Sequence, residues 1–264
     1  MQRDMVTMMR ILDEISKVIR DTARDMSDLD ERGREVCMGA DGTPTTGIDK
    51  AAEDAVLMFL DDNDVPLNVL SEEAGHIDRG HESTLVMDPI DGTYNSVMGV
   101  PLYTASLAVG RDSMRGIETG LIRNLVTDDV FKASKGGGAF RNGRPIRTRQ
   151  CDPERMVMVL YLGRSAHPDT FDLLRRAMRT RAYGCASIEM CLVAQGCVDV
   201  FYMNSLVRAK SIRVIDIAAS QLILREAGGE MFGLDGELLD MPLDLDAREN
   251  FLAIGQPGAR GSVL

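Results

Sequence analysis

Two aspartates three positions apart give the sequence its strongest chemical signal. Residues 88–93 read Asp-Pro-Ile-Asp-Gly-Thr, directly after an apolar, strand-like stretch and before a predicted helix. Pro89 keeps the local backbone extended and Gly92 permits a sharp turn, so the carboxylates of Asp88 and Asp91 can approach one point. The amides of Gly92 and Thr93 would face the same point, as at an anion site at a helix N-terminus.

Further acids lie at the ends of other predicted elements. Glu72 and Glu73 follow a strand-like segment, and Asp216 lies at the start of a long helix. If Glu72, Asp88, Asp91 and Asp216 cluster, they repel one another and raise their own pKa values unless cations neutralise them. Ligands that are all oxygen favour Mg²⁺ over zinc, with Mn²⁺ as a substitute.

Each acid also has an ordinary structural explanation. An Asp-x-x-Asp pair alone is usually a turn, and Asp49 follows Thr46 at the spacing of a helix capping box. Glu72 and Glu73 also suit a solvated surface pair, and Asp216 a favourable helix-dipole interaction. Glycines 136–138 lack a following Lys-Ser or Lys-Thr and therefore favour a hairpin connection over a phosphate cradle.

Composition argues against several classes of function. A formal net charge of −11 and a pI near 4.8 argue against binding to nucleic acid. The sequence has no apolar run of about 18 residues and no secretory leader, so we expect no membrane partner and a cytoplasmic protein. The five cysteines form no Cys-x-x-Cys pair and are expected to be buried thiols. The three histidines fit neither a zinc-protease nor a serine-hydrolase motif.

Hydrophobic periodicity predicts two parts of different texture. Helices are expected over about 5–30 and 47–62, strands over 67–70 and 85–87, and short antiparallel strands over 104–140, with a hairpin turn at Asn142-Gly143. The second part alternates strands at 155–160 and 198–202 with helices at 169–180, 187–195 and 213–227. We therefore expect an α+β domain over 1–150 with the metal site, and an α/β domain over 151–264 that contributes Asp216 and the substrate side.

In their order and spacing, these acidic segments resemble the three motifs of the inositol monophosphatase superfamily. The motifs are Glu72-Glu73, residues 88–93 and the Asp-Ile-Ala-Ala of 216–219, and the resemblance covers nearly the whole chain. Residues 39–45 and Tyr94-Asn95 resemble the archaeal branch that hydrolyses both inositol phosphate and fructose 1,6-bisphosphate. The resemblance implies a layered α/β sandwich of αβαβα order, the sugar phosphatase fold, commonly assembled as a homodimer.

The resemblance also implies roles for particular residues. One Mg²⁺ would be held by Glu72, Asp88 and the Ile90 carbonyl, a second by Asp88, Asp91 and Asp216, and a third more weakly near Glu72. Asp49 and the Thr93 hydroxyl would orient and deprotonate the attacking water, with help from Glu73, and the Gly92 and Thr93 amides would grip the phosphate. The sugar or inositol side would be lined by Gly184, Cys185 and Ala186. Lithium inhibition is a further implication.

The expected activity is Mg²⁺-dependent hydrolysis of a small sugar or polyol phosphate monoester, from inositol monophosphate, fructose 1,6-bisphosphate or both. Arg164 and Arg181, which flank the expected substrate helix, are candidates to bind the remote phosphate of a bisphosphate. Met38 and Ile215 stand where many relatives carry lysine and tryptophan, which bears on substrate detail and on the weaker metal.

Two alternative functions remain at this point. One is a nucleotide phosphatase acting on phosphoadenosine phosphate or NADP, although no aromatic pair for base stacking is obvious in the sequence. The other is a noncatalytic metal-binding regulatory homologue, against which the intact pair of Asp49 and Thr93 argues.

Overall fold

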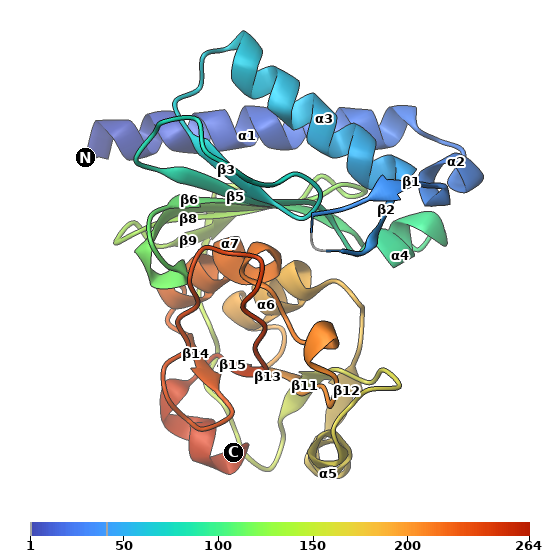
Figure 1. Ribbon diagram of the computed structural model, residues 1–264. Coiled ribbons are helices and arrows are strands. Elements are labelled where there is room, and N and C mark those ends of the chain that lie inside the picture. Colours follow the sequence, from blue (N-terminus) through green and yellow to red (C-terminus); the bar gives the residue numbers. More distant parts are fainter. Residues whose placement is uncertain (1, 41) are drawn as a thin grey trace.

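The protein consists of five stacked layers of helices and sheets in αβαβα order. A computed structural model describes residues 2–40 and 42–264 (Figure 1). A helix pair covers the larger sheet, a second helix pair lies between the two sheets, and a single short helix lies outside the smaller sheet. This arrangement confirms the expected fold class. Asp41, in one of the motifs quoted above, lies outside the described residues.

The outer helix layer is formed by α1 (Gln2–Asp25) and α3 (Gly47–Asp62). Both helices bury an apolar stripe at helical spacing against the larger sheet: Leu12, Ile15, Ile19 and Ala23 from α1, and Ile48, Ala52, Val56 and Leu60 from α3. The first helix was predicted to reach about residue 30, but it ends at Asp25. A separate helix, α2 (Leu29–Gly33), follows because Asp28 caps a new N-terminus by accepting hydrogen bonds from the Asp30 and Glu31 amides.

The larger sheet has eight strands in the order β10-β9-β8-β7-β6-β5-β3-β4. Only β3 and β5 run parallel, so these two strands end at the same edge of the sheet. The predicted series of short antiparallel strands is confirmed, as is the hairpin turn at Asn142 and Gly143, which both have positive φ. The strands are β3 (Asn68–Ser71), β4 (Gly75–Ile77), β5 (Thr84–Asp91), β6 (Thr104–Gly110), β7 (Ile117–Asn124), β8 (Val130–Ser134), β9 (Ala139–Arg141) and β10 (Arg144–Ile146).

The smaller sheet has five strands in the order β12-β11-β13-β15-β14. They are β11 (Val157–Leu160), β12 (Arg179–Arg181), β13 (Val200–Met203), β14 (Glu230–Gly233) and β15 (Phe251–Ile254). The helix predicted over 169–180 is shorter than expected, because α5 (Pro168–Arg176) ends before β12. Residues 179–181 instead pair with β11 in a parallel ladder, which satisfies their backbone hydrogen-bonding groups.

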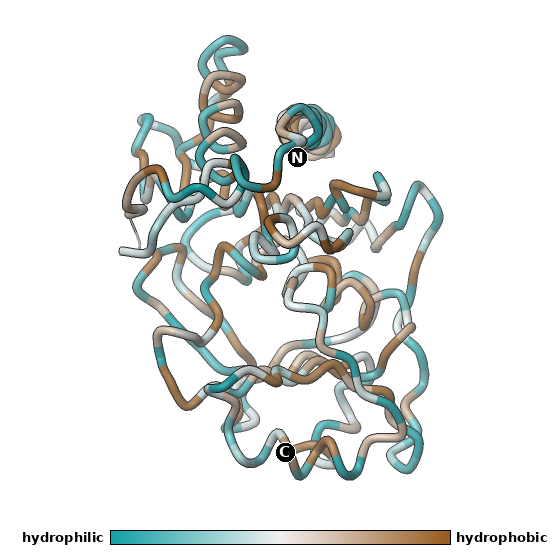
Figure 2. The backbone as a smooth tube through the Cα atoms, turned by 90° about the vertical axis from the view of Figure 1, so that its right-hand side faces the viewer, coloured by the Kyte–Doolittle hydropathy of each residue, from teal (hydrophilic) through white to brown (hydrophobic). Residues whose placement is uncertain are grey.

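Two apolar helices, α6 (Ala186–Ala194) and α7 (Val214–Glu226), fill the space between the sheets (Figures 1 and 2). Every residue of α7 from Val214 to Leu224 is buried. The helix can lie directly on β7 because Gly120 has no side chain; a Cβ there would come within 2.9 Å of the Ala219 carbonyl oxygen. The helix ends before Gly228, whose φ of +101° is the left-handed conformation that glycine commonly adopts just after the C-terminus of a helix.

The glycine-rich turn between β8 and β9 holds a carboxylate of the protein itself. The amides of Gly136 and Gly138 donate hydrogen bonds of 2.8 and 2.9 Å to the Glu226 carboxylate at the end of α7. This contact supports the interpretation of the turn as a hairpin connection, because its amide donors are already paired with Glu226.

The five cysteines are free thiols in different environments. Cys185 and Cys191 are buried, Cys151 is half-buried, and Cys37 and Cys197 are exposed. The prediction that all of them are buried was therefore wrong: α6 ends at Ala194, and Cys197 lies beyond its end, at the surface. Within the described residues, no helix has the length and apolar character needed to cross a membrane.

Candidate active site

The site is built around the end of β5, where the chain changes direction. The pairing of β5 with β6 shifts register between Asp88 and Asp91, so Pro89 and Ile90, which lie between them, leave the regular ladder. The Asp88 carboxylate accepts a hydrogen bond of 3.0 Å from the Ile90 amide. Gly92 then adopts φ +88°, and a Cβ there would come within 3.1 Å of the Cys185 side chain. Both the turn and this close approach require glycine.

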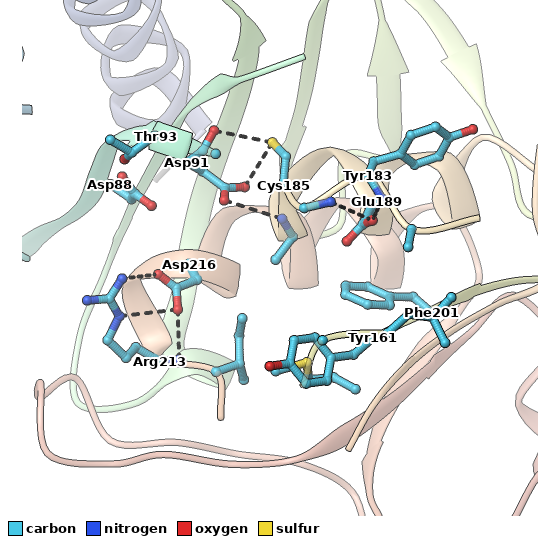
Figure 3. A pocket seen from close by; sticks show the side chains of 18 of the residues that line it. Asp88, Asp91, Thr93, Tyr161, Tyr183, Cys185, Glu189, Phe201, Arg213 and Asp216 are labelled. Carbon is cyan, nitrogen blue, oxygen red and sulfur yellow. Dashed lines mark hydrogen bonds and ion pairs between the residues drawn. The ribbon is translucent and has the colours of Figure 1, made fainter. Parts of the chain in front are cut away.

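Five acidic side chains line one cavity of about 600 Å³: the four predicted ones, Glu72, Asp88, Asp91 and Asp216, and also Glu189. Glu72 follows β3, the parallel neighbour of β5, and Asp216 lies in the first turn of α7. Figure 3 shows Asp88, Asp91 and Asp216 on the same side of the cavity. Of the residues predicted for the site, the lining contains Glu72, Asp88, Ile90, Asp91, Gly92, Thr93, Gly184, Cys185, Ala186 and Asp216.

The charges of this cluster act on one another. Burial raises the pKa of Asp88 well above its usual range, and the negative charges of Asp91, Glu72 and Asp216 raise it further. The pKa of Asp91 is also raised, chiefly by burial, although hydrogen bonds from Ser187 oppose the rise. The Ser187 and Ala186 amides, at the N-terminus of α6, donate to Asp91 over 2.7 and 3.3 Å. The protein therefore gathers more negative charge than it neutralises.

The donor set fits a hard divalent cation. All four side chains offer carboxylate oxygens, the ligands that Mg²⁺ and Mn²⁺ prefer. In residues 2–40 and 42–264, however, no three His, Cys, Asp or Glu side chains are already grouped closely enough to hold a metal ion. A cation at this site would have to draw the carboxylates together.

The predicted pair of Asp49 and Thr93 is in contact. The Thr93 hydroxyl lies 3.0 Å from Asp49 Oδ1 and 2.9 Å from the Ile90 carbonyl oxygen, and it donates to these acceptors. The Thr46 hydroxyl donates to Asp49 Oδ2 over 2.6 Å and accepts no hydrogen bond from a helix amide, so the capping box is incomplete. Burial raises the pKa of Asp49, and the hydrogen bonds from Thr46 and Thr93 oppose this rise.

Glu73 lies behind Glu72 and outside the cavity lining. Its carboxylate accepts a hydrogen bond from the Thr45 hydroxyl. Burial, opposed by this hydrogen bond, raises the pKa of Glu73 to about 7. The pair of Glu72 and Glu73 is therefore not a simple solvated surface pair.

The loop before α6 packs directly against the β5 turn. Cys185 donates its thiol hydrogen to Asp91, with a distance of 3.2 Å to Oδ2, and burial raises the pKa of this thiol. Glu189, one helical turn into α6, accepts hydrogen bonds from the amides of Tyr183 and Gly184 over 2.5 and 3.2 Å. This segment is thus fixed at one end by a carboxylate of the cluster and at the other by Glu189.

The two arginines predicted to bind a remote phosphate lie just beyond the cavity lining. Arg164 and Arg181 are exposed, next to the lining residues Gly163 and Ala182 respectively. The Arg181 guanidinium donates to the neighbouring Thr180 carbonyl oxygen over 2.7 Å. Of the two departures from the family pattern, Met38 is exposed on β1 (Glu35–Met38) and Ile215 is fully buried in α7.

Sequence reasoning missed Arg213, Glu189 and an aromatic wall. Arg213 bridges Glu72 and Asp216, and its position three residues before an acid at a helix start was an available signal. Tyr161, Tyr183 and Phe201 line the cavity on the side away from the carboxylates (Figure 3). No aromatic pair is evident in the sequence pattern, but folding brings these aromatic side chains together in the cavity lining.

Comparisons with known proteins agree with this geometry. Residues 2–257 match the model of the inositol monophosphatase family. A fructose-1,6-bisphosphatase/inositol-1-monophosphatase of Archaeoglobus fulgidus is 34% identical, with 94% of this chain and 93% of the relative covered. A bifunctional NADP phosphatase/NAD kinase of Methanococcus maripaludis is 31% identical over 89% of this chain and 44% of its own length. The crystal structure of an inositol monophosphatase-fructose 1,6 bisphosphatase superposes with a TM-score of 0.83 and 29% identity, covering 96% of this chain and 98% of the other.

The buried Glu189 carboxyl predicts a pH-dependent stability. Burial raises its pKa to about 8 from an ordinary value of 4.5, against the opposing amide hydrogen bonds. Between these pH values the folded state binds more protons than the unfolded chain, so stability falls as pH rises. In chelator, the free energy of unfolding of the wild-type protein should fall by up to about 1.4 kcal/mol per pH unit relative to that of Glu189→Gln, measured by urea unfolding from pH 5 to 8. Glu118→Gln, at an exposed site on β7, is the control; a difference that stays constant with pH would contradict the prediction.

Proposed function

The chain belongs to the inositol monophosphatase family and is a phosphoric monoester hydrolase, and on this basis we propose that it hydrolyses inositol monophosphate, fructose 1,6-bisphosphate or both with two to three Mg²⁺ ions. The observation that carries the proposal is the contact between Thr93 and Asp49 directly beside the four-carboxylate cluster. A purely structural metal site does not need such a pair. The names of the archaeal relatives support the choice of substrates.

In this proposal, Glu72, Asp88, Asp91, Asp216 and the Ile90 carbonyl hold the cations. When bound, the cations lower the pKa of the attacking water and stabilise negative charge on the leaving oxygen. Mn²⁺ fits the same oxygen donors.

The residues around the cluster handle the proton and the phosphate. The Thr93 hydroxyl orients the attacking water, and Asp49 accepts a proton from this water. Glu73 assists through the hydrogen bond that it accepts from the Thr45 hydroxyl. The Gly92 and Thr93 amides bind phosphate oxygens. As the water oxygen bonds to phosphorus, the ester P–O bond breaks; the leaving oxygen takes a proton from solvent water, and Asp49 returns the proton that it accepted to solvent, so the products are the alcohol and phosphate. The Gly184, Cys185 and Ala186 segment contacts the sugar or inositol ring.

A phosphate-release assay over a panel of substrates tests the proposal. Inositol 1-phosphate, fructose 1,6-bisphosphate, NADP and phosphoadenosine phosphate are each supplied with Mg²⁺ or with chelator. We expect release from the first two compounds that depends on Mg²⁺. Absence of release from all four would favour the noncatalytic homologue, and preference for a nucleotide would favour the nucleotide phosphatase.

The aromatic side chains of the cavity are the reason for including nucleotides in the substrate panel. Tyr161 and Tyr183 border the cavity across from the acids, where a base could stack on them. The relatives named as NADP phosphatases match most of this chain. We further propose a cytoplasmic homodimer, a hypothesis that size-exclusion chromatography with light scattering and fractionation of cells would test.

The role of Thr93 predicts a difference between two substitutions. Thr93→Ala removes the hydroxyl that contacts Asp49, so kcat should fall by about 10²-fold or more, whereas Thr93→Ser keeps the hydroxyl and most activity. Asp88→Asn should be equally impaired, because it removes a charge shared by two cations. Asp172→Asn, at an exposed site on α5, is the control. Full phosphate release by folded Thr93→Ala and Asp88→Asn proteins would refute these roles.

The rim arginines predict a change in substrate preference. Arg164→Ala and Arg181→Ala should raise KM for fructose 1,6-bisphosphate about tenfold, because only that substrate carries a second phosphate. The KM for inositol 1-phosphate should change little. Arg175→Ala, on the exposed face of α5, is a matched control. Equal losses for the two substrates would remove the support for a remote phosphate site.

A further inference from the structure

One half-buried arginine holds two of the carboxylates that the proposed function assigns to cations. Arg213 is the residue before α7, and its amide donates to Asp216 Oδ2 over 2.9 Å. Its guanidinium turns back onto the same carboxylate, with Nη2 2.9 Å from Oδ1 and Nε 3.3 Å from Oδ2. Asp216 therefore has both oxygens engaged by one residue, as Figure 3 shows.

The same guanidinium also reaches across the cavity entrance to Glu72. Nη2 donates to Glu72 Oε2 over 2.8 Å, and Nη1 forms an ion pair with Oε1. Glu72 lies 141 positions earlier in the chain, so this contact joins the edge of the larger sheet to the start of α7. The planar guanidinium matches two carboxylates at once, which a lysine could not do.

Helix capping alone does not explain this arrangement. The backbone of Arg213 already completes its share of the cap with Asp216. The additional hydrogen bonds to Glu72 do not cap the N-terminus of α7, but they place a positive charge within the acidic cluster. That charge also opposes the rise in the pKa of Asp88, which burial and the neighbouring acids produce.

We propose that Arg213 is an internal counter-ion that holds Glu72 and Asp216 when no metal is bound and competes with divalent cations for them. The inference rests on the proposed function, in which both carboxylates are metal ligands. One guanidinium offsets one of up to four negative charges, so the metal-free cavity stays acidic enough to attract cations. A cation that takes Glu72 or Asp216 must displace the guanidinium or bind beside it against repulsion. Arg213 thereby lowers the affinity for the metal and stabilises the metal-free fold.

Two substitutions separate this role from that of a simple structural brace. Arg213→Met keeps much of the length and removes the charge. Arg213→Lys keeps the charge but not the planar fork. Calorimetric titration with Mg²⁺ gives the affinity, and thermal unfolding in chelator and in saturating Mg²⁺ gives the stability of each state. Arg175→Met, on the exposed face of α5, is the control.

For Arg213→Met we expect Mg²⁺ binding that is at least about threefold tighter. We also expect a lower Tm in chelator and a larger rise in Tm on addition of Mg²⁺. Arg213→Lys should fold and show the same changes to a smaller extent, and the control should match the wild type.

Three results would overturn the inference. The first is unchanged or weaker Mg²⁺ binding by Arg213→Met, or by Arg213→Lys where the methionine variant does not fold. The second is an equal loss of Tm with and without metal, which would assign Arg213 a structural role only. The third is a wild-type protein that takes up no Mg²⁺, which would refute the proposed metal site itself and is distinguishable because it requires no variant.

Discussion

The repulsion among buried carboxylates at the end of β5 is the interaction on which the rest of the site depends. Asp88 and Asp91 lie within the sheet edge, where burial and neighbouring acids disfavour their charged forms. Two sets of contacts hold the cluster together. The N-terminal amides of α6 bind Asp91, and Arg213 binds Glu72 and Asp216. Both leave net negative charge, so the cavity would attract cations and repel a free phosphate.

The layered fold explains why acids so far apart in sequence meet. The parallel pair β3 and β5 ends at one edge, so Glu72 and Asp88 emerge together. The second half of the chain supplies α6 and α7, which pack on the larger sheet through the close contact of Gly120 with α7. Asp216 is therefore positioned by the core, and any loosening of that packing would move one side of the site relative to the other.

The sequence predicts those features of the site that depend on residues close to one another in the chain. The sharp turn at Gly92, the hairpin strands and the end of α7 follow from glycine and apolar spacing and were found as expected, whereas β5 continues to Asp91, beyond the strand predicted over 85–87. The partners of Glu189, the amides of Tyr183 and Gly184, are local and were overlooked. The contact of Arg213 with Glu72 was missed because it depends on how the larger sheet and α7 pack. The end of α5 was misplaced for a related reason: residues 179–181 form a strand only because β11 lies beside them. The aromatic wall likewise exists only once β11, β13 and the loop before α6 are assembled.

In the proposed function, the two ends of the cavity have different roles in substrate recognition. In the proposed reaction, the acidic end meets the same phosphate group in every phosphate monoester, so it would supply reactivity and little discrimination between substrates. In the proposed reaction, selectivity would therefore arise at the other end, from Tyr161, Tyr183 and Phe201 in the lining and from the arginines on the rim. Glu189 fixes the Tyr183 and Gly184 amides, so the shape of that wall is tied to the same helix whose N-terminus orients Asp91. Because one helix serves both ends, a change that reshapes the substrate wall through α6 would also disturb the acid cluster. Substitutions at the exposed rim avoid this coupling, which makes the rim the place where relatives of this fold can change substrates at little cost to the chemistry.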